Sequence, residues 1–254
     1  MSDCINEITD GFHAVFDSQG GGHNNQKHDG ESRSCIVPFI DQNKHLSALL
    51  DEPRIHGLLC SLLGDDFNYM GSDGNIYVGD TNWHSDGWNE GSLYVKIAFY
   101  LDSISRDTGC LRVVPGSHNV DDAYGAALND FLPQPNTNFG MPGSDIPSIA
   151  LDVEPGDILI FNHRLKHSSW GGDNQRRMFT INCGEHVIDE FIPGLKHYIA
   201  GSARFWLDSM YGEIMKETAG PQRMKHLEQV LANEGHLAAL SAQARKDNKE
   251  PSRG

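Results

Sequence analysis

Short apolar runs separated by turn residues fill the chain from residue 67 to residue 179, and this pattern limits the fold more than any other feature. Gly, Pro, Asn and Asp bound the runs, as in Asp107-Thr108-Gly109 and Pro115-Gly116-Ser117, which is typical of strands joined by tight turns. We predict strands at residues 74–79, 81–86, 93–101, 110–114, 149–153, 157–162, 166–170 and 176–183. Evenly spaced short strands favour a barrel or a double-sheet jelly roll.

Helices are expected on both sides of this region, so the predicted fold is mainly β with α+β character. Residues 41–63 carry leucines at helical spacing, and Pro53 divides them into two short helices, the second ending near Gly64. After Pro193 the apolar spacing is again helical and predicts two or three helices within residues 200–245, followed by a charged tail.

Two segments read as irregular structure. Residues 1–34 are rich in Gly, Asn, Asp and His and are expected to be loop-rich, with residues 11–16 as one strand. Residues 119–148 are rich in Asn, Pro and Gly, and a loop of that length in a compact domain is usually a lid or a binding loop. We expect residues 1–254 to form a single domain with its β-core at 65–185.

Composition excludes several classes of partner. The net charge of -15 disfavours nucleic acid and anionic membranes, and no apolar run approaches the ~20 residues that span a bilayer. The five cysteines are odd in number, widely spaced and free of Cys-x-x-Cys pairs, which indicates reduced thiols in a cytoplasmic protein. The oligomeric state cannot be read from these features.

The pair His84 and Asp86 is the strongest chemical signal in the chain. On a strand, residues i and i+2 point to one face, where they can bind one side of a metal ion. A second histidine would complete the two-His-one-carboxylate triad that holds Fe(II) with three open positions. His167 follows an apolar strand about 80 residues later. His163 is four residues before His167 and would point to the same strand face, so it competes with His167 as the third ligand. His118 lies in a Pro-Gly-Ser-His turn and is expected to be structural.

An arginine follows these histidines on the next predicted strand. A guanidinium one strand from a metal is suited to bind a carboxylate through two hydrogen bonds. Arg177 is preferred over the adjacent Arg176 because its spacing and the apolar residues after it fit better.

At this point the chain resembles the phytanoyl-CoA dioxygenase family of Fe(II)/2-oxoglutarate-dependent oxygenases, over roughly residues 45–185. The resemblance rests on Trp83-His84-Ser85-Asp86, on Asp107-Thr108-Gly109-Cys110-Leu111-Arg112-Val113-Val114-Pro115-Gly116-Ser117-His118, on Pro155-Gly156-Asp157, on His167-Ser168-Ser169 and on Arg177. It implies a double-stranded β-helix of the cupin-like jelly-roll type. It also implies iron held by His84, Asp86 and His167, and 2-oxoglutarate anchored by Arg177 with help from Ser169. The chain departs from the family where Ser168 replaces a common glycine.

Further residues are candidates because of their place near these motifs. Lys96 shares one strand face with Tyr100 and could meet a carboxylate of the cosubstrate or the substrate, or else lie exposed at a sheet edge. Possible cosubstrate contacts on the strand before the metal pair are Asn75 and Tyr77. Candidates for contact with the substrate at the entrance of its pocket are Trp88, Asn89, Tyr100 and Trp170. Trp170 could equally belong to the hydrophobic core.

The resemblance implies an enzyme that uses Fe(II), 2-oxoglutarate and O2. We expect it to hydroxylate, desaturate or cyclise a small metabolite or natural-product intermediate. A carboxylate at Asp86 argues against halogenation, because halogenating relatives have a small residue there. No dense Lys/Arg cluster suits an acyl-CoA. The alternative is a cupin-like isomerase or hydrolase that uses another metal without 2-oxoglutarate.

Overall fold

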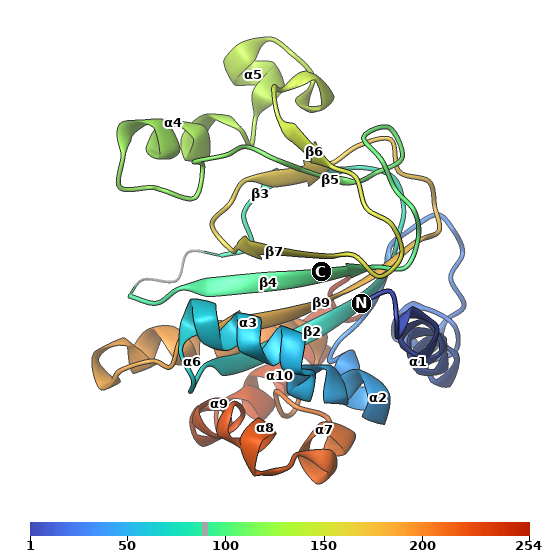
Figure 1. Ribbon diagram of the computed structural model, residues 1–254, viewed down its shortest axis with the longest axis vertical. Helices are drawn as coiled ribbons and strands as arrows, with labels where there is room; N and C mark the ends of the chain where they lie inside the picture. The colour runs from blue at the N-terminus through green and yellow to red at the C-terminus, as the bar shows by residue number, and fades with distance from the viewer. Residues whose placement is uncertain (88–90) are drawn as a thin grey trace.

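Two antiparallel sheets face each other in the computed structural model, which describes residues 1–87 and 91–254 (Figure 1). The larger sheet has the strand order β1-β2-β9-β4-β7 and the smaller one β3-β8-β5-β6. The strands are β1 (Ser34–Ile36), β2 (Asn68–Tyr77), β3 (Thr81–His84), β4 (Tyr94–Tyr100), β5 (Leu111–Val113), β6 (Ile149–Leu151), β7 (Ile158–Asn162), β8 (His167–Ser169) and β9 (Arg176–Gly184). The predicted mainly β, α+β fold class is confirmed, and the two facing antiparallel sheets are consistent with the predicted jelly roll.

All eight predicted strands are present, and two features of the larger sheet were missed. Strand β1 is too short to show a pattern, and β2 begins at Asn68 rather than at residue 74. The register of β2 against β9 shifts between Tyr69 and Gly71, and Gly71 has a φ of 108°. This bulge breaks the alternation from which the sequence analysis reads a strand.

The N-terminal segment is a helix, so the predictions of a loop and of a strand at residues 11–16 are wrong. Helix α1 spans Ile5–Ser18 and buries Ile8, Phe12 and Val15 in the hydrophobic core on the outer face of the larger sheet. These positions are four and three residues apart, which is helical spacing. A Cβ at Gly11 would lie 3.0 Å from Leu46, so glycine at this position permits close packing on the next helix.

The outer face of the larger sheet carries most of the remaining helices (Figure 1). Helices α2 (Lys44–Ser47) and α3 (Pro53–Leu63) confirm the two predicted before the β-core, with Glu52 capping α3. The C-terminal part forms five described helices rather than two or three, and Gly212, Gly220 and Gly235 lie at three of the four breaks between them. They are α6 (Ile192–Gly201), α7 (Glu213–Thr218), α8 (Pro221–Lys225), α9 (Glu228–Asn233) and α10 (Leu237–Asp247). Among the described helices, none is both long enough and apolar enough to cross a bilayer.

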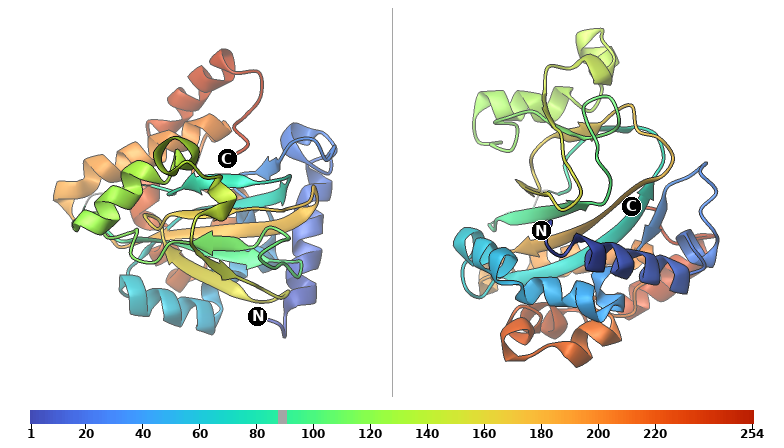
Figure 2. Two further views of the ribbon diagram at one scale, coloured as in Figure 1. Left: turned by 90° about the horizontal axis from the view of Figure 1, so that it is seen from above. Right: turned by 45° about the vertical axis from the view of Figure 1, so that its right-hand side comes forward.

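The segment 119–148 lies on the opposite side of the molecule, beside the smaller sheet (Figures 1 and 2). It contains helices α4 (Ala123–Phe131) and α5 (Pro135–Phe139), so it is less irregular than predicted. Its Leu132 and Ile146 form a small cluster with Trp83 of β3, and the Trp83 indole donates to the Gly143 carbonyl at 2.8 Å. The segment therefore packs directly behind the strand that carries His84.

Replacing Gly74 by alanine is expected to destabilise the fold by about 1–3 kcal/mol. A Cβ there would lie 2.0 Å from the ring of Phe39, which is fully buried between α1 and the sheet. Urea denaturation measures the change. The control is Gly57→Ala at an exposed position of helix α3, where a Cβ meets nothing within 4 Å and should stabilise by about 0.5–1 kcal/mol. Equal effects of the two substitutions would contradict this packing.

Candidate metal centre

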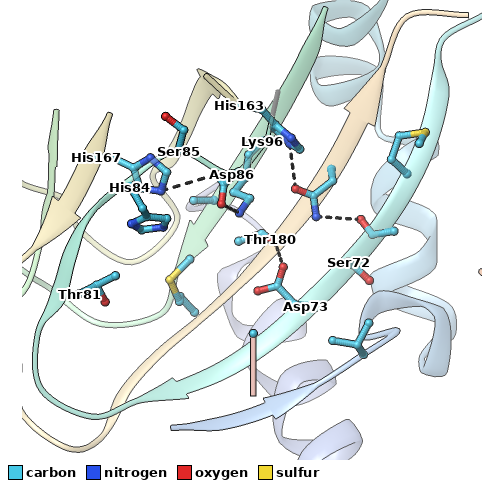
Figure 3. Close-up of a pocket in the computed structure, with 18 of the residues that line it drawn as sticks. Ser72, Asp73, Thr81, His84, Ser85, Asp86, Lys96, His163, His167 and Thr180 are labelled. Carbon is cyan, nitrogen blue, oxygen red and sulfur yellow. Dashed lines mark hydrogen bonds and ion pairs between the residues drawn. The ribbon is translucent and has the colours of Figure 1, made fainter. Parts of the chain in front are cut away.

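Pairing between β3 and β8 brings the predicted ligands together (Figure 3). His84 and His167 are register partners, and their ring centroids are 4.2 Å apart. Asp86 follows two residues after His84, and its backbone N–H donates to the His163 carbonyl at 2.8 Å. One ligand atom from each of His84, Asp86 and His167 lies within 4.8 Å of the other two. The structure therefore assembles the three side chains that the sequence singled out.

Each imidazole is oriented by a backbone carbonyl. Nδ1 of His84 donates to the Asn82 carbonyl at 2.8 Å, and Nδ1 of His167 donates to the Leu165 carbonyl at 2.9 Å. Because a carbonyl only accepts, Nδ1 carries the proton in both rings and Nε2 keeps its lone pair. This arrangement fixes the tautomer that a metal-binding histidine needs.

The Asp86 carboxylate completes the donor set. Its Oδ1 accepts from the Lys96 ammonium at 2.7 Å, and its Oδ2 lies 3.6 Å from His167 Nε2. Oδ2 is buried without a hydrogen-bond partner among the described residues. A buried carboxylate oxygen beside two imidazole lone pairs fits a divalent metal ion.

The protonation states agree with metal binding. Burial raises the pKa of the Asp86 carboxyl, but the charges of Lys96 and His167 lower it by more, so the pKa lies well below its usual range. Burial lowers the pKa of His167 to about 4. At neutral pH the site therefore offers one carboxylate and a neutral His167 ring.

Neither rival histidine joins the cluster. His163 lines the same cavity, but its Nε2 is 3.1 Å from the side-chain oxygen of Asn182. His118 is exposed in its turn. The even spacing of His163 and His167 did not decide which of them is the third ligand. The register of β3 with β8 favours His167, because this pairing places His167 directly opposite His84.

Arg177 does not face the cavity, so the prediction that places it there is wrong. Its guanidinium pairs with Asp102, with NH2 2.5 Å from Oδ1, and contacts His13 of α1. Along β9, Arg177 has the parity of Phe179 and Ile181, which pack in the outer core. The apolar residues after Arg177, which the sequence analysis took as support, therefore mark the wrong face.

Arg176 occupies the position that was assigned to Arg177. Its NH1 donates to the Ser169 hydroxyl and to the Gly109 carbonyl, each at 2.6 Å. Its Nε is buried without a hydrogen-bond partner among the described residues, and its guanidinium lies 4.9 Å from the centre of the Tyr77 ring. On the same face of β9, the residues that line the cavity are Met178, Thr180 and Asn182.

The remaining predicted contacts divide into two groups. Tyr77, Tyr100 and Lys96 line the cavity, although Lys96 contacts Asp86. Asn75 instead accepts from Arg33 at 2.8 Å and donates to Asp73 at 2.5 Å. Trp170 packs in the small cluster behind the site and donates to Ser168, so the core reading fits it better. Trp88 and Asn89 lie outside the described residues.

The sequence analysis missed a polar wall that faces the metal ligands across the cavity (Figure 3). It consists of Asp73 on β2 with Thr180 and Asn182 on β9, and the Thr180 hydroxyl donates to Asp73. Arg33 lies beside it, with NH2 3.6 Å from Asp73 Oδ2. The sequence did contain a signal for this wall. Thr180 and Asn182 alternate with buried apolar residues on the strand that begins at Arg176, so their side chains share one face of it. The whole cavity has a volume of about 930 Å³.

The metal-free protein is expected to lose stability as the pH falls from 6.5 toward 4, because the unfolded chain then protonates His167 and the folded chain does not. The full shift corresponds to about 3 kcal/mol. His167→Gln should remove that part of the loss, measured by urea denaturation at neutral pH and at about pH 4.5. His118→Gln, at an exposed histidine, should keep the wild-type pH dependence. An unchanged pH dependence in His167→Gln would contradict the burial of a neutral ring.

Comparisons with known proteins identify the fold and the family of the chain. The chain has the fold of the carbocyclase SnoK from nogalamycin biosynthesis, with 17% identity, a TM-score of 0.53 and coverage of 73% of this chain and 76% of SnoK. It also matches iron-bound EctD from S. alaskensis, with 19% identity, a TM-score of 0.53 and coverage of 73% and 69%. No curated protein matches the chain by sequence. The family model for phytanoyl-CoA dioxygenase matches residues 24–178, more than half of the chain. The chain therefore belongs to the phytanoyl-CoA dioxygenase family, which confirms the predicted class of Fe(II)/2-oxoglutarate-dependent dioxygenases.

Proposed function

We propose that residues 1–254 form one oxygenase domain that hydroxylates, desaturates or cyclises an unactivated C–H position of a small metabolite or natural-product intermediate, with release of succinate and CO2. His84, Asp86 and His167 hold the Fe(II) in this proposal. Support comes from Asp86 Oδ2, which has no hydrogen-bond partner among the described residues, and from the two imidazoles that each use Nδ1 for a backbone carbonyl and leave Nε2 toward the site. Three ligands leave three positions open for the cosubstrate and O2.

The position of Arg176 carries the proposal. Ser169, to which Arg176 donates, is two residues from His167 on β8, so the two side chains share a face about 7 Å apart along the strand. A keto acid that binds the metal with its 2-oxo end extends over a comparable length. Its far carboxylate would then reach a buried guanidinium that can form two parallel hydrogen bonds. In this proposal Arg176, not Arg177, anchors 2-oxoglutarate with Ser169.

The other residues of the cavity orient the substrate and exclude water. Iron with 2-oxoglutarate, when bound, supplies the oxidation by O2 that replaces or removes the substrate hydrogen. Phe161 and Met178 give the cavity apolar lining, and the polar wall of Asp73, Thr180 and Asn182 offers hydrogen bonds to the substrate. A carboxylate at position 86 occupies the metal position that a halide would need, which supports a hydroxylation-type outcome.

A small-molecule substrate suits the cavity. Its volume of about 930 Å³ lies within the range of sites for small ligands. The net charge of -15 repels nucleic acid and anionic membranes at long range. The carbocyclase SnoK acts in nogalamycin biosynthesis, and this supports a natural-product intermediate and a cyclisation outcome among the candidates.

Arg176→Met is expected to weaken 2-oxoglutarate binding roughly 10- to 100-fold, because a buried charge-assisted hydrogen bond contributes about 1.5–3 kcal/mol. Anaerobic titration of the Fe(II) form, followed by its visible charge-transfer band, measures the affinity. The matched control is Arg177→Met, which removes the same group from the neighbouring residue outside the cavity and should leave the affinity within about twofold.

The opposite ranking of the two variants would restore Arg177 as the anchor. Wild-type protein that binds a divalent metal but no 2-oxoglutarate would contradict the proposed function and favour the metal-dependent isomerase or hydrolase. Succinate formation in the presence of iron, lost in a His84→Ala, Asp86→Ala double variant, tests turnover directly.

A further inference from the structure

Lys96 lines the cavity, and its ammonium contacts Asp86, one of the three proposed metal ligands. It lies on β4, where its side chain shares the inner face with Ala98 and Tyr100. Its ammonium is 2.7 Å from Asp86 Oδ1, and the two side chains are only 16% and 14% exposed. Figure 3 shows Lys96 reaching Asp86 from the larger sheet, on the side away from His167. The sequence analysis predicted that Lys96 could bind a carboxylate of the cosubstrate. In the structure its ammonium is instead paired with Asp86, so the two contacts compete.

The contact makes the two oxygens of Asp86 different. Oδ1 accepts from Lys96, whereas Oδ2 is buried, has no hydrogen-bond partner in the described part of the chain and lies 3.6 Å from His167 Nε2. The hydrogen bond from the Asp86 backbone N–H to the His163 carbonyl fixes the main chain at the same residue. Oδ2 is thus the oxygen that faces the His167 imidazole.

This difference matters because a carboxylate can bind a cation through one oxygen or through both. Six-coordinate iron with three single-atom protein ligands keeps three positions open. A carboxylate that bound through both oxygens would occupy one of those positions. An ammonium on Oδ1 satisfies that oxygen and places a positive charge where a second metal contact would form.

We propose that Lys96 is a positioning residue that keeps Asp86 a one-oxygen ligand and so preserves the third open position of the metal. This inference rests on the proposed function of the site, since it assumes a divalent metal held by His84, Asp86 and His167. It assigns Lys96 to the ligand and not to 2-oxoglutarate or the substrate.

The first test uses Co(II)-loaded protein without 2-oxoglutarate. Lys96→Met removes the ammonium and keeps an unbranched chain of similar length. The visible Co(II) spectrum should change, because Oδ1 becomes free to bind. Thr180→Val is the matched control: it removes from the same cavity a hydroxyl that donates to Asp73, and it should keep the wild-type spectrum. An unchanged spectrum in Lys96→Met would overturn the proposal.

The second test separates action through Asp86 from direct contact with 2-oxoglutarate. Lys96→Met should weaken 2-oxoglutarate binding to the metal-loaded protein by roughly tenfold or more, because Asp86 Oδ1 would occupy a metal position that the keto acid needs, while Co(II) affinity should not fall. In an Asp86→Asn background at saturating Co(II), Lys96→Met should have no effect on 2-oxoglutarate binding, because an amide coordinates through its single oxygen. A loss of equal size in that background would overturn the proposal and assign Lys96 to the cosubstrate.

The wild-type protein provides a third measurement that does not require any variant to fold. X-ray absorption at the cobalt edge distinguishes one-oxygen from two-oxygen carboxylate binding by the distance from the metal to the carboxylate carbon. One-oxygen binding is expected, and two-oxygen binding would overturn the proposal. Failure of the wild type to bind Co(II) would instead contradict the proposed function, so the two failures are distinguishable.

Discussion

The site depends on the pairing of the short strands β3 and β8. Only two residue pairs define this ladder, and one of them is His84 with His167. A shift of one residue would turn one of these side chains to the opposite face and separate the imidazoles. Two features outside the ladder hold this register: the Trp83 indole donates to Gly143 in the segment beside the smaller sheet, and β8 pairs with β5 on its other side. The segment 119–148 therefore supports the proposed metal ligands from behind.

Strand β9 connects this site to the rest of the protein. It lies between β2 and β4, so both of its edges are hydrogen-bonded. Its inner face carries Arg176 and the polar wall, and its outer face carries Phe179 and Ile181, which are fully buried under the helices. Packing of Phe179 against Phe39 and Phe99 holds the strand rigid. The outer core thus positions the inner side chains, because both belong to the same backbone.

Sequence reasoning succeeded where a local pattern determines the structure. Turn residues marked the strands of the β-core, and the i, i+2 pair of His84 and Asp86 does bring both side chains to one site, although β3 ends at His84 and Asp86 lies in the loop after it. It failed where the deciding contact comes from elsewhere in the fold. The helix α1 was hidden by glycines and polar residues, although its buried positions have helical spacing. Arg177 was chosen from the apolar residues that follow it, but those residues face the outer helices, and only the assembled sheet shows which face is enclosed.

The same limit explains why the role of Lys96 could not be read from the sequence. Parity correctly placed Lys96 on the inner face of β4, but its partner comes from the loop after β3. Burying either charge alone would be costly, since a buried ion without a counter-charge is strongly disfavoured. The ion pair is therefore a condition for placing a carboxylate at this depth in the cavity. Asp86 can reach the interior as an anion because Lys96 accompanies it, and its other carboxylate oxygen is left without a hydrogen-bond partner among the described residues.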